Sequence, residues 1–176
     1  MQPIEFRAPW GKQLKRATAF SVAVLGVVFC AGLASLRADA PWFASAVLLT
    51  LPLAIVAGTL PFMVRGYLLL EDALLIERLG WRTRLPLAGL KAVGGDSEAM
   101  RSSIRLLGNG GLFSFTGEFW NRRLGRYRAL ATDPDRAVVL RYSKRTIVIT
   151  PHDPQHFIMR ARTLAKHADF EHQRAS

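Results

Sequence analysis

The sequence has 176 residues, half of them hydrophobic, a formal net charge of +11 and a single cysteine. A chain of this length holds one ordinary domain and a short additional segment. The lone Cys30 excludes an intrachain disulfide and argues against a thiolate metal site. The positive charge favours an anionic neighbour, either nucleic acid or a lipid surface.

Two uncharged apolar runs lie in the first part of the chain, at residues 17–36 and 40–64. A helix rises about 1.5 Å per residue, so about twenty apolar residues span a bilayer core of roughly 30 Å. We therefore expect a transmembrane hairpin over residues 17–64, with helices at about 17–36 and 42–64 and a basic segment, residues 1–16, before them. Buried core helices of a soluble protein are the alternative, which two uncharged runs in tandem disfavour.

The charges that flank the two apolar runs predict the orientation of the hairpin. Four Lys and Arg residues precede the first run and Arg65 follows the second, whereas the connecting loop carries one residue of each sign, Arg37 and Asp39. Positively charged flanks remain on the cytoplasmic side of a membrane. The sequence thus predicts a multi-pass protein of the inner (cytoplasmic) membrane, with both termini in the cytoplasm.

A cleaved signal peptide is an alternative for the first apolar run. Ala38-Asp39-Ala40 has the small-x-small pattern of a cleavage site. However, the apolar run is longer than the 7–15 residues typical of a signal peptide, and Arg37 and Pro41 fit cleavage poorly. If cleavage did occur, the second run would stop transfer and the remaining chain would still face the cytoplasm.

Downstream of Arg65 the sequence alternates between apolar and polar residues, and turn residues divide it into about seven short strands. The segments 94–97 and 108–111 are rich in glycine and are expected to form loops. The expected strands include Tyr67–Leu70, Ala73–Leu79 and Trp81–Leu85, a hairpin within Gly117–Leu130, and a β-branched hairpin formed by Ala137–Tyr142 and Thr146–Thr150.

A C-terminal amphipathic helix is predicted to begin at Asp153-Pro154, because aspartate caps helices and proline fits the first helical position. Apolar residues recur at helical spacing after this point, so we expect a helix to about His167 and a polar tail, residues 168–176. Short strands followed by one helix are typical of a small antiparallel β-barrel or sandwich capped by that helix. The expected fold class is therefore an α+β membrane protein.

Four segments of the chain also resemble one known family. They are Gly108–Phe113, Gly117–Asn121, Leu124–Ala129 and Ile147–Pro154, and the resemblance extends over about residues 67–166. These segments resemble bacterial pleckstrin-homology (PH) domains that follow transmembrane hairpins. The resemblance implies a PH-like cytoplasmic domain, residues 65–167, in a family whose biochemical role is largely unassigned, and it brings no catalytic residues.

No catalytic, cofactor-binding or metal site is predicted. A phosphate-binding loop needs a lysine after its last glycine, but Glu118 follows Gly117. His152 and His156 are four residues apart, but Asp153 occupies the place of the glutamate in helical zinc sites. We therefore expect no cofactor and no enzymatic activity, and an enzyme of unrecognised type is the least favoured alternative.

The strongest candidate for a binding site surrounds the turn of the Gly117–Leu130 hairpin. Arginine matches the geometry of phosphate, aromatic rings favour the lipid headgroup zone, and each basic residue near an anionic leaflet contributes about 1 kcal/mol. A solvated hairpin whose aromatic residues are partly in the core is the alternative. The candidate contacts to lipid or other anions are Trp120, Arg122, Arg123, Arg126 and Arg128, with Tyr127 between the last two.

Together these patterns favour a membrane-anchored, non-catalytic PH-like binding or scaffold module at the cytoplasmic face. Its expected partners are the lipid bilayer, anionic headgroups, a second copy of the chain or another membrane protein. No recognised motif supports binding of nucleic acid. A regulatory subunit of an envelope or transport complex is the alternative, with specificity in the helices.

Overall fold

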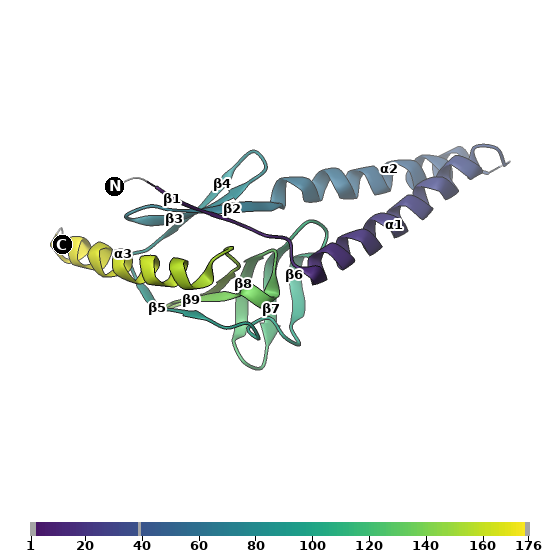
Figure 1. Ribbon diagram of the computed structural model, residues 1–176. Helices are drawn as coiled ribbons and strands as arrows, with labels where there is room; N and C mark the ends of the chain where they lie inside the picture. Colours follow the sequence, from purple (N-terminus) through teal and green to yellow (C-terminus); the bar gives the residue numbers. More distant parts are fainter. Residues whose placement is uncertain (1–2, 39, 175–176) are drawn as a thin grey trace.

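A helical hairpin projects from a domain built of two β-sheets in the computed structural model, which describes residues 3–38 and 40–174 (Figure 1). The hairpin consists of α1 (Lys12–Ser35) and α2 (Trp42–Thr59), and α2 continues into the short 3-10 helix η1 (Leu60–Phe62). The first helix begins earlier than expected and the second ends earlier. Val64, expected in the membrane span, is instead buried as the first residue of a strand.

The first sheet is antiparallel and has the strand order β1-β2-β3-β4. Its strands are β1 (Ile4–Arg7), β2 (Val64–Leu69), β3 (Ala73–Arg78) and β4 (Arg82–Pro86). The last three correspond to the first three strands expected from the sequence. The two sheets pack around a common core, which α3 (Pro154–Arg174) covers on one side (Figure 1).

The N-terminal segment departs from the sequence-based expectation of a separate basic segment. Residues 4–7 form the edge strand β1, which pairs with β2 so that Phe6 lies opposite Tyr67. Phe6 is buried, and its ring meets the edge of Phe157 with 5.2 Å between ring centroids. A strand of four residues carries little periodicity, and its partner lies beyond both helices, so no local pattern could identify it.

The second sheet has the order β5-β9-β10-β8-β7-β6, and it corrects the expected purely antiparallel arrangement because β8 and β10 are parallel. The two hairpins expected from the sequence are present in it. Its strands are β5 (Leu90–Gly95), β6 (Ile104–Gly110), β7 (Phe115–Asn121), β8 (Gly125–Ala131), β9 (Val138–Tyr142) and β10 (Thr146–Ile149).

Strands β5 and β6 were expected to be partly loop because of their glycines. In β6, Gly108 has a φ of +103° and lies against the opposite strand, where a Cβ atom would be 2.3 Å from the carbonyl oxygen of Thr116. The glycine therefore permits a close approach of two strands here and does not mark a turn. The predicted start of the last helix is confirmed, since the amide of His156 donates to Oδ1 of Asp153 at 3.0 Å, but the helix continues past His167 to Arg174.

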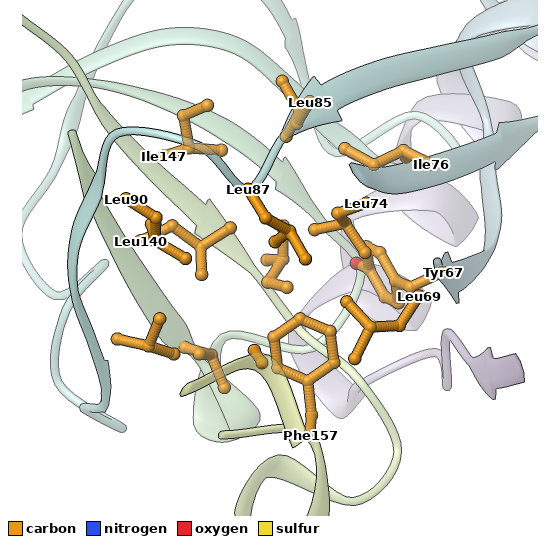
Figure 2. Close-up of a cluster of buried hydrophobic side chains, with 14 of the residues drawn as sticks. Tyr67, Leu69, Leu74, Ile76, Leu85, Leu87, Leu90, Leu140, Ile147 and Phe157 are labelled. Atoms are coloured by element: carbon orange, nitrogen blue, oxygen red, sulfur yellow. The ribbon is translucent and has the colours of Figure 1, made fainter. Parts of the chain in front are cut away.

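The main hydrophobic core lies between the two sheets and α3 (Figure 2). Full burial of an aliphatic or aromatic side chain contributes about 1.5–3 kcal/mol, so this cluster supplies most of the apolar stabilisation. A second cluster on the other face of the larger sheet contains Phe119 and Tyr127. The fully buried members of the main core include Tyr67, Leu69, Leu74, Ile76, Leu140, Ile147 and Phe157.

Tyr67 also joins the two sheets through a buried polar contact. Its hydroxyl donates to the carbonyl of Leu130 at 2.8 Å and accepts from the amide of Thr150 at 3.1 Å. The Thr150 hydroxyl in turn accepts from the amides of Thr132 and Asp133 at 2.8 and 3.2 Å. Burial raises the pKa of Tyr67 to about 12, because the phenolate would lose its hydration in the core.

Replacing Tyr67 by phenylalanine is expected to lower the free energy of unfolding by about 1–3 kcal/mol, since it leaves the buried Thr150 amide without an acceptor. The folded state holds the Tyr67 proton more tightly than the unfolded chain does. The stability that this group gives the wild type is therefore fully present below pH 10 and is lost as the pH rises through about 12. Tyr67→Phe has no hydroxyl to titrate, so its stability should fall less over this pH range. Denaturant unfolding in micelles across this pH range measures both effects.

The control for this measurement is Tyr142→Phe, which removes a half-buried hydroxyl that donates to the carbonyl of Pro86 at 3.0 Å. It should cost less than Tyr67→Phe at neutral pH. Equal losses from the two variants would contradict the role given to the Tyr67 contact.

Truncating Phe6 to alanine is expected to lower the free energy of unfolding by about 3–5 kcal/mol, as for other buried aromatic residues. The same truncation of Phe43, which is 59% exposed on α2, serves as the control and should have little effect. Thermal or denaturant unfolding of the full chain in micelles compares the two. An effect of Phe6→Ala no larger than that of Phe43→Ala would show that β1 is not part of the folded domain.

Candidate functional site

Both helices of the hairpin are fixed to the domain at their bases by polar contacts. The carbonyl of Phe62, at the end of η1, accepts from Nη1 of Arg78 at 3.2 Å and from the Ser114 hydroxyl at 3.1 Å. On α1, the buried Thr18 hydroxyl donates to the carbonyl of Gly111 at 2.8 Å and accepts from the amide of Phe113 at 3.1 Å. The loop between β6 and β7 therefore lies directly against the helix bases.

Arg78 is the most unusual residue of this junction. It ends β3 and is only 5% exposed, and its guanidinium lies 4.5 Å from the ring centroid of Trp81. Its Nε donates to the Thr83 hydroxyl at 3.2 Å. Its Nη2, however, is the one buried side-chain nitrogen or oxygen atom in the described part of the chain that has no hydrogen-bond partner. A buried cation with an unsatisfied donor is costly, so this position calls for an explanation.

Burial, together with the nearby positive charge of Arg128, lowers the pKa of Arg78 to about 10. The guanidinium remains protonated at neutral pH despite this shift. Two cations that repel each other form a site that an anion would stabilise.

A cavity of about 640 Å³ opens beside Arg78, between the helix bases and the larger sheet. Ser21 of α1 and Ile55 and Gly58 of α2 line its helical side. The charged residues on its domain side are Arg78, Arg105, Arg128 and Glu118, so three arginines and one glutamate give a formal charge of +2. The cavity is thus apolar toward the helices and basic toward the domain.

The pairing of β6, β7 and β8 places three of these lining residues in one row. Leu107 lies opposite Glu118, and Glu118 lies opposite Arg128, so all three side chains occupy the same face of the sheet. The Glu118 carboxylate binds Nε of Arg126 at 2.8 Å. Within the described residues, neither Arg128 nor Arg105 has an ion-pair partner.

The structure places the candidate anion contacts that were predicted around the β7–β8 turn in different locations. Of the five candidates, only Arg128 lines the cavity; Trp120 and Arg126 lie opposite each other, two register positions further from the helices. Arg123 binds the carboxylates of Asp96 and Glu98 at 3.0 and 3.3 Å.

Arg122 is exposed in the turn itself, and Tyr127 is buried and stacked on Phe119 with 6.0 Å between centroids. The turn follows Asn121, at the end of β7 opposite the helix bases (Figure 1). Seven strand residues separate these ends by roughly 20 Å. The arginine-rich turn and the cavity are therefore two separate basic surfaces.

Sequence reasoning missed Arg78 and Arg105. Arg78 ends an expected strand and is followed by Trp81, which gives a weak local sign of a cation near an aromatic ring. Arg105 lies in a stretch without a recognisable strand pattern. Only the pairing of β6 with β7 places it opposite Phe119, the residue after Glu118.

A second cavity, of about 920 Å³, lies on the outer side of the first sheet. Its four arginines and two glutamates give the same formal charge of +2, but Glu77 there already binds Arg82 at 2.9 Å. The cavity between the helix bases and the larger sheet has one acidic residue in its lining and not two, and it is therefore the better candidate for an anion. The charged residues that line the second cavity are Glu5, Arg7, Arg65, Glu77, Arg78 and Arg82.

A sheet-rich domain closed by a C-terminal helix is consistent with a PH-like fold. A family model described as a bacterial PH domain matches residues 65–165, which is more than half of the chain. The protein therefore belongs to the bacterial PH domain family, and the resemblance noted in its sequence is confirmed. Searches of curated proteins and of solved structures gave no match.

Proposed function

We propose that this protein is a membrane-anchored, non-catalytic PH-like binding module at the cytoplasmic face, held by α1 and α2, and that it binds anionic lipid headgroups. One observation carries the proposal: the basic cavity lies where the apolar hairpin meets the domain. A membrane that surrounds the hairpin would bring its headgroups to the same level as this cavity.

The exposure of the helices supports insertion into a membrane. Helix α1 and the stretch from Trp42 to Phe62 are long and apolar enough to cross a bilayer. Only 11% of the apolar 18-residue stretch in each of them is buried. A core helix of a soluble protein would bury most of this surface, and a large exposed apolar surface in water is unfavourable. Exposed apolar residues include Phe20 at 73%, Val27 at 70% and Leu53 at 60%.

The packing of the N-terminal segment supports retention of α1 and argues against a cleaved leader. Removal of residues 1–40 would strip β1 from the first sheet and Phe6 from the main core. It would also remove Leu14, which is fully buried at the base of α1. Asp39, at the centre of the Ala38-Asp39-Ala40 pattern, lies outside the described residues.

The charge distribution supports a cytoplasmic domain. Because β1 pairs with β2, both ends of the hairpin lie on the domain side. Lys12, Lys15 and Arg16 are exposed in the first turns of α1, also on the domain side. Positive charge at this end of a membrane helix favours the cytoplasm.

The membrane topology can be tested with single cysteines in a Cys30→Ser background. Ala38→Cys lies in the exposed loop between α1 and α2, and Ser143→Cys lies in the exposed turn between β9 and β10. A membrane-impermeant maleimide should label the first in intact cells and the second only after permeabilisation. Reversed labelling would contradict the orientation, and release of the protein by alkaline carbonate would contradict membrane insertion.

Lipid binding can be tested by thermal unfolding of the full chain in lipid nanodiscs. Nanodiscs that contain phosphatidylglycerol should give a higher Tm than nanodiscs of phosphatidylcholine alone, because a ligand that binds the folded state stabilises it. The difference should shrink as salt is added, since screening weakens attraction between exposed charges. Equal Tm values at low salt would contradict lipid binding while leaving the anchoring unaffected.

A further inference from the structure

We propose that the cavity at the helix bases binds a single anionic phospholipid, with the lipid phosphate among Arg78, Arg105 and Arg128. The inference rests on the proposed function and adds to it the site and the chemistry of the headgroup. It also distinguishes this site from the arginine-rich turn, which lies at the other end of β7.

The residues that line the cavity carry a hydrogen-bond donor and positive charge that the chain itself does not use. Nη2 of Arg78 has no partner although the side chain is 95% buried, and Arg105 and Arg128 form no ion pair with any described residue. Glu118 is the one acidic residue that lines the cavity, and Arg126 already binds its carboxylate. A phosphate group supplies several acceptor oxygens that match the planar donors of arginine.

The helical side of the cavity indicates that the phosphate belongs to a lipid. Ile55 and Gly58 lie in the last turns of α2, at the end of an apolar span, and Ser21 faces them from α1. Ser21 is four residues inside the apolar run that begins at Ala17, which corresponds to about 6 Å along the helix. The cavity therefore extends from the headgroup level into the outer part of the hydrocarbon region.

Gly58 leaves room for an acyl chain beside α2. A Cβ atom built at this position meets no other atom within 4 Å, so the space next to the glycine is open. A volume of about 640 Å³ is also within the range of sites that hold small molecules. A headgroup in the basic part and the start of an acyl chain along Gly58 would occupy both chemical halves of the cavity.

The decisive experiment measures lipid binding to the full-length protein by native mass spectrometry from detergent. The probes are phosphatidylglycerol and phosphatidylcholine with the same acyl chains, and glycerol 3-phosphate as a soluble phosphate. Wild-type protein should retain one phosphatidylglycerol molecule with a lower Kd than phosphatidylcholine. Glycerol 3-phosphate should not displace it at the same concentration.

Two variants test the cavity, and each has a matched control. The double variant Arg105→Gln/Arg128→Gln should raise the Kd for phosphatidylglycerol roughly 30-fold, or about fivefold for each charge removed. The same change at Arg122 and Arg123, in the distal turn, should alter the Kd less than about twofold.

The second variant blocks the cavity without changing its charge. Gly58→Leu should prevent phosphatidylglycerol binding, because its side chain would occupy the space beside α2. Gly26→Leu is its control, since Gly26 on α1 is equally open but does not line the cavity. Unfolding midpoints measured without lipid show whether each variant remains folded.

The possible outcomes separate this inference from the proposed function. Loss of binding in the turn variant but not in the cavity variants would overturn the cavity site and leave anionic lipid binding intact. Equal wild-type affinity for the two phospholipids would overturn both the site and the lipid-binding function. Displacement by equimolar glycerol 3-phosphate would overturn the assignment to a lipid and identify the ligand as a soluble phosphate ester.

Discussion

The antiparallel pairing of β1 with β2 is the constraint on which the rest of the structure depends. The chain contributes a strand to the first sheet, leaves it through α1 and returns through α2 into the neighbouring strand. Both helix bases are therefore held to one edge of the domain, where Thr18 and the Phe62 carbonyl bind the loop before β7. Without this pairing, α1 would be tied to the domain only through its first turns and the cavity would have no fixed helical wall.

The second determining feature is the buried cation at this junction. Arg78 is held by Trp81, Thr83 and the Phe62 carbonyl, yet it keeps an unsatisfied donor and faces a second cation, Arg128. An apolar side chain of similar size would often be as stable or more stable at such a position. Residues that cost stability in this way are found where a protein binds a ligand, which agrees with the anion site proposed at this junction.

Local sequence patterns were sufficient for the elements that have a long apolar run, a regular alternation of apolar residues or a specific cap. The two long helices, the β7-β8 and β9-β10 hairpins and the helix start at Asp153 were all predicted from such patterns. Strands β1, β5 and β6 were not, because one is too short for periodicity and the others contain glycines that usually mark turns. The parallel pairing of β8 with β10 was also missed, because β9 lies between these two strands in the chain and a local pattern predicts only the pairing of consecutive strands, which is antiparallel when the turn is short.

The sequence by itself determined that two apolar helices precede a basic bacterial PH domain, because composition and periodicity depend only on residues close together in the chain. It also indicated that arginine and aromatic residues gather around residues 120–128. Only the tertiary structure decided which charged residues each of these arginines approaches. Strand register turns Arg128 toward Arg78 and places Arg105 beside the same cavity, whereas Arg123 is directed to Asp96 and Glu98. The physical reason is that charges act through distance in space, and strand pairing sets that distance between residues far apart in the sequence.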